Sequence, residues 1–212
     1  MSTIEDISTL LQQGRAPKVK ALVAQALEEG IEPKRILEEG LLAGMNIIGV
    51  KFKNNEVFVP EVLISARAMN MGLEILKPHL VQAGVEDKGT AVIGTVKGDL
   101  HDIGKNLVKM MLEGKGLKVI DLGVDVSAEK FVEAAKENNA DLICCSALLT
   151  TTMVEIKSVV EAVDAAGLRS HAKIMIGGAP VTQSFCDSVG ADSYTPDATS
   201  AAEVALAYCT NK

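Results

Sequence analysis

One histidine of this chain stands in a sequence that suits metal binding. His101 lies in the glycine-flanked segment 98–104, directly after the apolar run 90–96. An imidazole on a loop can reach a metal ion, and borderline metals bind well through nitrogen. A ligating histidine usually donates its other ring N–H to a carboxylate, and Asp99 is two residues away. A lone histidine after a strand is more often an ordinary loop residue, so a metal-binding role for His101 and Asp99 depends on the motifs that accompany them.

Two further motifs of small residues follow, each again at the end of an apolar run. Ser146-Ala147-Leu148 comes after the intervening residues 105–145, and Gly177-Gly178 comes after residues 149–176. The three motifs follow the apolar runs 90–96, 141–146 and 173–177, which we expect to be the first, third and fourth strands of a sheet. Ligands of open α/β sheets bind at the carboxyl ends of the strands, near the point where the strand order reverses. In the flavodoxin-like order 2-1-3-4-5 these strands are neighbours, so we expect the three loops to meet at one edge.

The second part of the chain alternates short apolar runs with helical patterns. The strand candidates are residues 90–96, 118–121, 141–146, 173–177 and 193–194. The helix candidates are residues 103–114, 128–138, 152–166, 180–189 and 198–209. Five strand–helix units with short loops predict an α/β fold, a flavodoxin-like (Rossmann-type) doubly wound sheet of five parallel strands.

The first part of the chain shows helical periodicity throughout. Four segments with apolar residues at helical spacing predict a four-helix bundle, and they are residues 4–13, 16–29, 33–48 and 60–75. A polar stretch bounded by glycines then separates the two patterns. We therefore expect a helical cap domain over residues 1–84, a linker over 85–89 and the α/β domain over 90–212.

The composition argues against several classes of protein. The apolar fraction of 48% supports a packed core, and the formal net charge of −7 disfavours binding to nucleic acid, whose phosphates would be repelled. The first residues do not read as a secretory signal, and no apolar run reaches the roughly 20 residues that cross a bilayer. Cys144 and Cys145 lie in an apolar run and are interpreted as buried thiols. These features predict a reduced, cytoplasmic protein with no nucleic-acid or membrane partner.

Asp-x-His-x-x-Gly, Ser-x-Leu and Gly-Gly, in this order and spacing, resemble the signature of cobalamin-binding domains. The resemblance implies a cobalamin cofactor bound base-off/His-on, in which His101 replaces the cofactor's own base as the lower ligand of cobalt. It also implies a relay from His101 through Asp99 to Thr152, where the cobalamin module of methionine synthase has a serine. The cofactor-binding residues that it implies are Asp99, His101, Asp102, Ile103, Gly104, Ser146, Leu148, Thr150, Thr152, Gly177, Gly178 and Tyr194.

The helical part carries a second resemblance. Phe58-Val59-Pro60-Glu61 and Ser65-Ala66-Arg67-Ala68-Met69 resemble the cap of methionine synthase and, more closely, that of the two-domain corrinoid proteins of anaerobic methyltransferase systems. In this family the cap shields the methyl group on cobalt, a role that falls to Phe58 here. The resemblance implies a methyl carrier, with methylcobalamin as its loaded form, that is not a complete catalyst alone. Its partners would be a substrate-specific methyltransferase, a second methyltransferase that serves tetrahydrofolate or coenzyme M, and a reductive activator.

Other functions share the histidine motif. The cobalamin-binding subunit of an adenosylcobalamin-dependent mutase lacks the helical cap, so residues 1–83 argue against it. A cobalamin-based sensor that regulates transcription needs a basic DNA-binding region, whereas an acidic bundle precedes the module here. A flavodoxin-like domain with another ligand would leave three spaced motifs as a coincidence.

Overall fold

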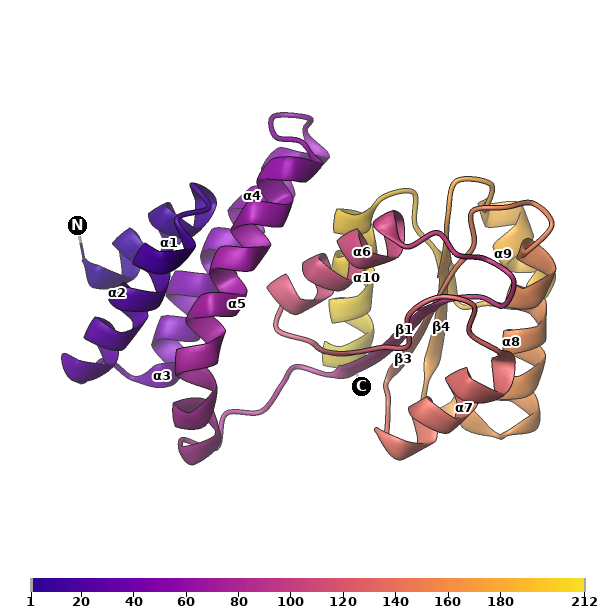
Figure 1. Cartoon of the computed structure of the whole chain (residues 1–212). Coiled ribbons are helices and arrows are strands. Elements are labelled where there is room, and N and C mark those ends of the chain that lie inside the picture. Colours follow the sequence, from indigo (N-terminus) through magenta and orange to yellow (C-terminus); the bar gives the residue numbers. More distant parts are fainter. Residues whose placement is uncertain (1, 212) are drawn as a thin grey trace. The chain divides into compact units, whose positions relative to one another are not determined.

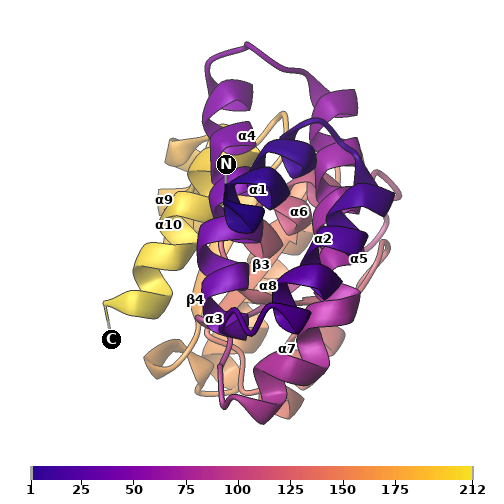
Figure 2. The ribbon, with the colours of Figure 1, turned by 90° about the vertical axis from the view of Figure 1, so that its left-hand side faces the viewer.

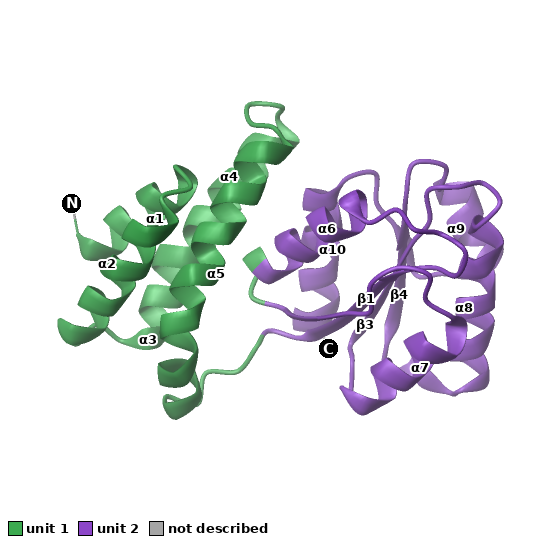
Figure 3. Cartoon of the chain, in the orientation of Figure 1, with its two compact units in different colours: residues 1–87, 114–116 green, residues 88–113, 117–212 purple. Residues whose placement is uncertain are grey.

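The computed structural model of the chain describes residues 2–211. The chain forms two compact units, one of residues 1–87 with 114–116 and one of residues 88–113 with 117–212 (Figure 3). The first unit is built of helices, and the second combines a parallel sheet with helices (Figure 1).

The helical unit is a bundle of four long helices. They are α1 (Thr3–Gln12), α2 (Ala16–Glu28), a continuous helix that ends with α4 (Ala43–Lys53), and α5 (Val59–Gln82). Helix α2 packs along α5, and α1 packs against both α2 and α4 (Figure 2). The bundle that the apolar spacing predicted is therefore confirmed for the described residues.

The third helix of the bundle contains a π-helical stretch that the sequence did not predict. Helix α3 (Pro33–Arg35) continues without a break into η1 (Ile36–Leu42) and then into α4. Within η1, a Cβ on Gly40 would lie 3.1 Å from Cγ2 of Ile7 in α1. The missing side chain thus lets α1 approach the widened turn closely.

The second unit contains, within residues 2–211, five parallel strands in the order β2-β1-β3-β4-β5. The strands are β1 (Thr90–Thr95), β2 (Lys118–Asp121), β3 (Leu142–Ser146), β4 (Lys173–Gly177) and β5 (Ser193–Tyr194). The register pairs Thr95 with Ser146 and Ser146 with Gly177, so β1, β3 and β4 end side by side. The flavodoxin-like fold and its strand order are confirmed.

Helices cover both faces of this sheet. Helices α6 (Ile103–Gly114) and α10 (Ala198–Thr210) lie on one face, and α7 (Ala128–Glu137), α8 (Met153–Ala165) and α9 (Gln183–Val189) lie on the other (Figure 1). Apolar side chains of alternate strand positions join Phe131 of α7 in the core under the second group. Gly94 in β1 makes room for this ring, because a Cβ there would lie 2.8 Å from Cζ of Phe131.

The helices of the α/β unit agree with their predicted bounds to within one residue, except for α9. It begins at Gln183 and not at residue 180, because Thr182 caps it by accepting a hydrogen bond from the backbone N–H of Phe185 at 3.2 Å. A short 3-10 turn, η2 (Leu168–Ser170), was not predicted. Among residues 2–211 there is no helix with the length and apolarity that a membrane span requires.

The cysteine thiols give a first testable prediction. All four cysteines of the chain are buried, as expected for Cys144 and Cys145. Burial raises the pKa of the Cys144 thiol to about 12 and also raises the pKa of Cys145 and Cys186. Because the thiolate is the reactive form, we expect almost no reaction of the native protein with a thiol reagent such as DTNB at pH 8. In guanidinium chloride the same reagent should titrate four thiols, and fast stoichiometric labelling of the native protein would contradict this burial.

Candidate functional site

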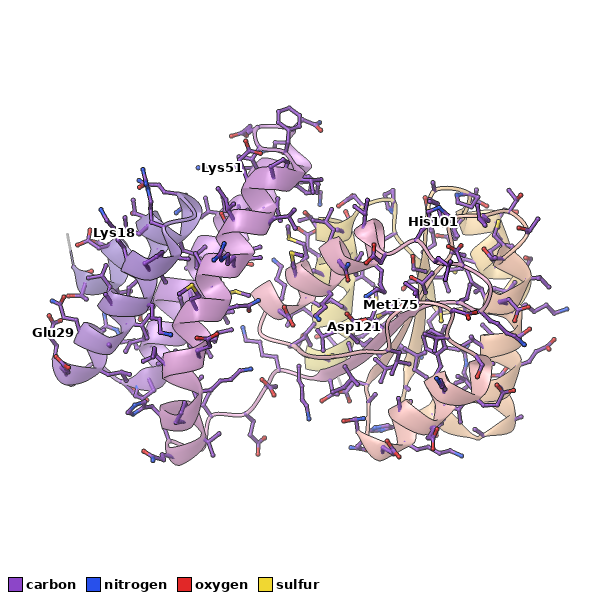
Figure 4. All side chains as sticks on the ribbon, in the orientation of Figure 1. Lys18, Glu29, Lys51, His101, Asp121 and Met175 are labelled. Atoms are coloured by element: carbon purple, nitrogen blue, oxygen red, sulfur yellow. The ribbon has the colours of Figure 1, made fainter. Side chains whose placement is uncertain are left out.

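The loops after β1, β3 and β4 adjoin at the carboxyl edge of the sheet. The backbone N–H of Val96 donates to the carbonyl of Ser146 at 3.0 Å, and that of Ala147 donates to the carbonyl of Gly177 at 3.1 Å. Both hydrogen bonds extend the pairing just past the strands. The three motifs are therefore brought together, and Figure 4 labels His101 on the loop that follows β1.

Asp99 is the centre of this edge. Its carboxylate is fully buried, and Oδ2 accepts hydrogen bonds from the backbone N–H groups of Leu148 at 2.7 Å and Leu149 at 3.2 Å. The hydroxyl of Thr152 also lies 2.7 Å from Oδ2. The second oxygen, Oδ1, lies 3.1 Å from the backbone nitrogen and 2.7 Å from Nδ1 of His101. One carboxylate thus joins the first two motif loops.

These contacts keep Asp99 ionised. Burial alone would raise the pKa of this carboxyl. The hydrogen bonds from the Thr152 hydroxyl, from the Leu148 N–H and from His101 outweigh that effect and hold the pKa well below its usual range. Hydrogen bonds to an ionised acceptor are about twice as strong as neutral ones, so the buried charge is stabilised by donors that point at it.

The ionised carboxylate fixes the tautomer of His101. A carboxylate can only accept hydrogen bonds, so in the neutral ring the proton sits on Nδ1, which lies 2.7 Å from Oδ1 of Asp99. Nε2 then carries the lone pair. The His101 side chain is 51% exposed, in contrast to the buried Asp99. The pair can therefore present an oriented nitrogen ligand to a metal outside the protein surface.

The main chain of the histidine loop is also held by a hydrogen bond from the last residue of β1. Thr95, the last residue of β1, is fully buried, and its hydroxyl donates to the carbonyl of His101 at 2.8 Å. The residue before α6, Asp102, accepts hydrogen bonds from Asn106 through its carbonyl at 2.7 Å and its carboxylate at 3.0 Å. Asp102 thus acts as a helix-start residue in this structure.

A buried ion pair beside the loop was missed by the sequence reasoning. Lys105 is 3% exposed, and its Nζ lies 2.6 Å from Oδ1 of Asp121 at the end of β2. Lys109 lies 3.2 Å from the other oxygen. Burial alone would raise the pKa of Asp121, but these lysines and the Gly123 N–H lower it. The only signal in the sequence is the lysine directly after Gly104, and a lysine at the start of a helix is usually an ordinary surface residue.

The glycines of the motifs differ in their surroundings. A Cβ added to Gly104 or to Gly177 would meet no atom within 4 Å. Gly178 has φ +134°, and a Cβ there would lie 1.8 Å from the carbonyl oxygen of Ala147. Gly178 is therefore required by the packing of the loops themselves, whereas Gly104 and Gly177 leave open space.

Comparison with known proteins decides the family. Residues 89–205 match the model of the B12 binding domain, and residues 3–77 match a second model that is also described as a B12 binding domain. The chain belongs to the B12-binding corrinoid proteins. A corrinoid of the cobalamin type is its cofactor.

Relatives of this corrinoid protein align over most of its length. It is 48% identical over 177 residues to trimethylamine corrinoid protein 1 of Methanosarcina acetivorans, with 82% of each chain covered. It is 44% identical over 199 residues to the dimethylamine corrinoid protein of Methanosarcina barkeri, with 93% of each covered. Among solved structures, the methanol:cobalamin methyltransferase complex of Methanosarcina barkeri matches with a TM-score of 0.89 and 31% identity, over 99% of this chain and 80% of that chain.

The edge of the sheet fits a corrinoid in its chemistry. Four large apolar side chains of the first two motif loops are exposed, which suits a flat macrocycle with apolar faces. They are Leu100, Ile103, Leu148 and Leu149. Ser146 at the end of β3 is half-buried and Thr150 is exposed. Their contact with the cofactor stays a prediction.

Two predicted cofactor contacts, Tyr194 and Phe58, are not members of the hydrogen-bonded group around Asp99. Tyr194 in β5 is half-buried and packs against the apolar core. Phe58 precedes α5 in the helical unit, and its backbone N–H donates to the Glu61 carboxylate at 3.0 Å. Its side chain is 63% exposed, so it is not the buried core residue that a helix-start aromatic usually is. Both cofactor roles stay predictions.

Proposed function

We propose that this chain is a methyl-carrying corrinoid protein that binds its cofactor base-off/His-on, with His101 as the lower ligand of cobalt. The observation that carries the proposal is the His101 ring, whose Nδ1 lies 2.7 Å from a buried, ionised Asp99 while the side chain is 51% exposed. His101 would hold the metal of the corrinoid through a single imidazole nitrogen. When bound, the corrinoid supplies the cobalt that accepts and releases the methyl group.

The residues of the chain bind and orient in this proposal. Asp99 holds the proton on Nδ1 of His101, so that Nε2 stays available. Thr152 supports Asp99 in the relay that we predict, because its hydroxyl lies 2.7 Å from Oδ2. The exposed apolar side chains of the two loops would exclude water from a bound corrinoid, and Gly104 and Gly177 leave open space beside them. Ser146 and Thr150 offer hydroxyls to the nucleotide tail.

The names of the relatives support the transfer chemistry. They refer to trimethylamine, to dimethylamine and to a methanol:cobalamin methyltransferase complex. The proposed donor is therefore a small methylated compound, delivered by a substrate-specific methyltransferase. A second methyltransferase passes the methyl group to tetrahydrofolate or coenzyme M, and a reductive activator restores oxidised cofactor.

The helical unit acts as the cap in this proposal. We assign residues 1–84 to the cap, 85–89 to the linker and 90–212 to the cofactor domain, with Phe58 as the shield of the methyl group. The alignment with the dimethylamine corrinoid protein covers 93% of both chains and so includes the helical part. This favours a carrier over a mutase subunit, which has no such cap.

The visible spectrum of the cofactor-loaded protein tests the proposal. Apoprotein incubated with methylcobalamin should bind it stoichiometrically and show the spectrum of histidine-ligated cobalt. His101→Ala should convert the bound cofactor to the base-off spectrum, because the lower ligand is gone. His79→Ala is the matched control, since His79 is an exposed histidine of α5 in the other unit.

The outcomes separate the cofactor from its ligand. Wild-type protein that binds methylcobalamin with the same spectrum as His101→Ala would remove His101 from cobalt. Loss of the ligated spectrum in His79→Ala would point to indirect effects of histidine removal.

A further inference from the structure

The loop between β2 and α7 holds a residue with an unusual backbone conformation. Asp125 has φ +54°, in the left-handed region that few residues other than glycine, asparagine and aspartate adopt. Such conformations persist where the surrounding structure stabilises them, and they gather at functional sites. Neither the sequence motifs nor the proposed function gives Asp125 a role.

Asp125 contacts the main chain of the histidine loop at two points. Its Oδ1 accepts a hydrogen bond from the backbone N–H of Gly98 at 2.7 Å. Its own backbone N–H donates to the carbonyl of Asp99 at 3.0 Å. The two hydrogen bonds enclose the Gly98–Asp99 dipeptide, and Gly98 itself has φ +78°.

The segment that carries Asp125 is fixed to the end of β1. The backbone N–H of Thr95 donates to the carbonyl of Gly123 at 3.0 Å, and that of Val126 donates to the carbonyl of Thr95 at 3.0 Å. These bonds flank Asp125 on both sides in the sequence. Asp125 therefore makes its two contacts from a segment whose backbone is fixed, although the Asp125 side chain is exposed.

Asp99 is thus held from two directions. The loop after β3 fixes its carboxylate through the backbone N–H groups of Leu148 and Leu149 and through Thr152. The loop after β2 fixes its backbone through Asp125. Since the direction of a short side chain follows from its backbone, both supports are needed to point the carboxylate at His101.

We infer that Asp125 is a positioning residue that fixes the Gly98–Asp99 peptide and thereby aims the Asp99–His101 pair at the metal. This inference rests on the proposed function of His101. A more loosely held pair would place Nε2 at the ligand position for a smaller fraction of the time. The equilibrium of the bound cofactor would then shift from the histidine-ligated to the histidine-free form.

Two substitutions separate the acceptor oxygen from the backbone conformation. Asp125→Gly removes the acceptor but accepts the positive φ without strain, and the exposure of the side chain means that no core packing is lost. Asp125→Asn keeps an acceptor oxygen and tolerates the same φ, and is the matched control. Both variants are therefore expected to fold.

The first readout is hydrogen exchange of the Gly98 amide in the apoprotein. One lost hydrogen bond should speed this exchange about tenfold in Asp125→Gly, whereas Asp125→Asn should stay within about threefold of wild type. The second readout is the fraction of bound methylcobalamin with the histidine-ligated spectrum at fixed pH. The histidine-ligated fraction should fall in Asp125→Gly and should stay near the wild-type value in Asp125→Asn.

The results distinguish this inference from the proposed function. If wild-type protein does not show the histidine-ligated spectrum, the proposed function is contradicted. The positioning role of Asp125 is then contradicted too, because it depends on His101 as the ligand. If His101→Ala abolishes the ligated spectrum but Asp125→Gly leaves the ligated fraction at the wild-type value, the inference alone is overturned. Unchanged Gly98 exchange in Asp125→Gly overturns it as well, because the contact would then not support the loop.

Discussion

Asp99→Ala is expected to lower the free energy of unfolding of the α/β unit by about 3–5 kcal/mol. The fully buried carboxylate accepts from two backbone N–H groups of the loop after β3, from Thr152 and from His101. Truncation leaves these donors without an acceptor in a dry environment, at about 1–3 kcal/mol each for those that cannot reach water. Urea unfolding followed by circular dichroism measures the change.

Asp99→Asn separates shape from charge. The amide has nearly the same volume, but its NH2 group can donate to Nδ1 of His101 and so move the ring proton to Nε2. The variant should therefore fold better than Asp99→Ala and still lose the histidine-ligated spectrum. Retention of that spectrum in Asp99→Asn would show that the tautomer is not set by this contact.

The lowered pKa of Asp99 also predicts a dependence on pH. The folded chain has a lower pKa here than the unfolded chain, whose value is about 3.9. Ionised Asp99 therefore stabilises the fold fully above about pH 5, and this contribution is lost as the pH falls below about 4. In acid titrations followed by fluorescence of an added dye or by circular dichroism, Asp99→Asn should show a shallower loss of stability than wild type.

Gly178→Ala is expected to lower the free energy of unfolding by about as much as Asp99→Ala, for a different physical reason. Its Cβ would lie 1.8 Å from the carbonyl oxygen of Ala147 at a backbone φ of +134°, so the loop after β3 must move. Strain and overlap together predict a loss of about 3 kcal/mol or more in the free energy of unfolding. The moved loop carries the Leu148 and Leu149 N–H groups, so cofactor binding should weaken with it.

Gly177→Ala is the matched control in the neighbouring position. A Cβ there meets no atom of the protein within 4 Å, so the free energy of unfolding should change by less than about 0.5 kcal/mol. If the space beside Gly177 receives the cofactor, the alanine side chain should raise the Kd of methylcobalamin at least about tenfold, which corresponds to about 1.4 kcal/mol of binding free energy. Equal effects of both alanines on unfolding would contradict the different surroundings of the two glycines.

The sequence predicted those parts of the fold that a short local pattern determines. The strands Lys118–Asp121 and Lys173–Gly177 and the helix Ile103–Gly114 were predicted with their observed bounds, because each is a periodic run between turn residues. Helix α5 runs to Gln82, beyond the predicted residue 75, since the exposed Pro78 does not end it. The π-helical stretch was missed because packing around Gly40, and not periodicity, marks its place.

The site was predictable only where side chains from motifs meet. The resemblance to cobalamin-binding domains predicted a relay of Asp99, His101 and Thr152, and the structure joins these residues by hydrogen bonds. The hydrogen bonds from the backbone N–H groups of Leu148 and Leu149 could not be predicted, because every residue type except proline has such a group. Asp125 and the Lys105–Asp121 pair depend on where separate loops fold back, which one sequence does not reveal.

The buried thiols acquire a further meaning in a carrier of an activated methyl group. Such a group is an alkylating agent, and the strongest nucleophile that the chain itself could offer is a cysteine thiolate. All four cysteines are buried, and the raised pKa of Cys144, Cys145 and Cys186 keeps those thiols protonated near neutral pH. In the proposed carrier, this burial would disfavour methylation of the protein's own thiols and so keep the methyl group for the partner enzyme.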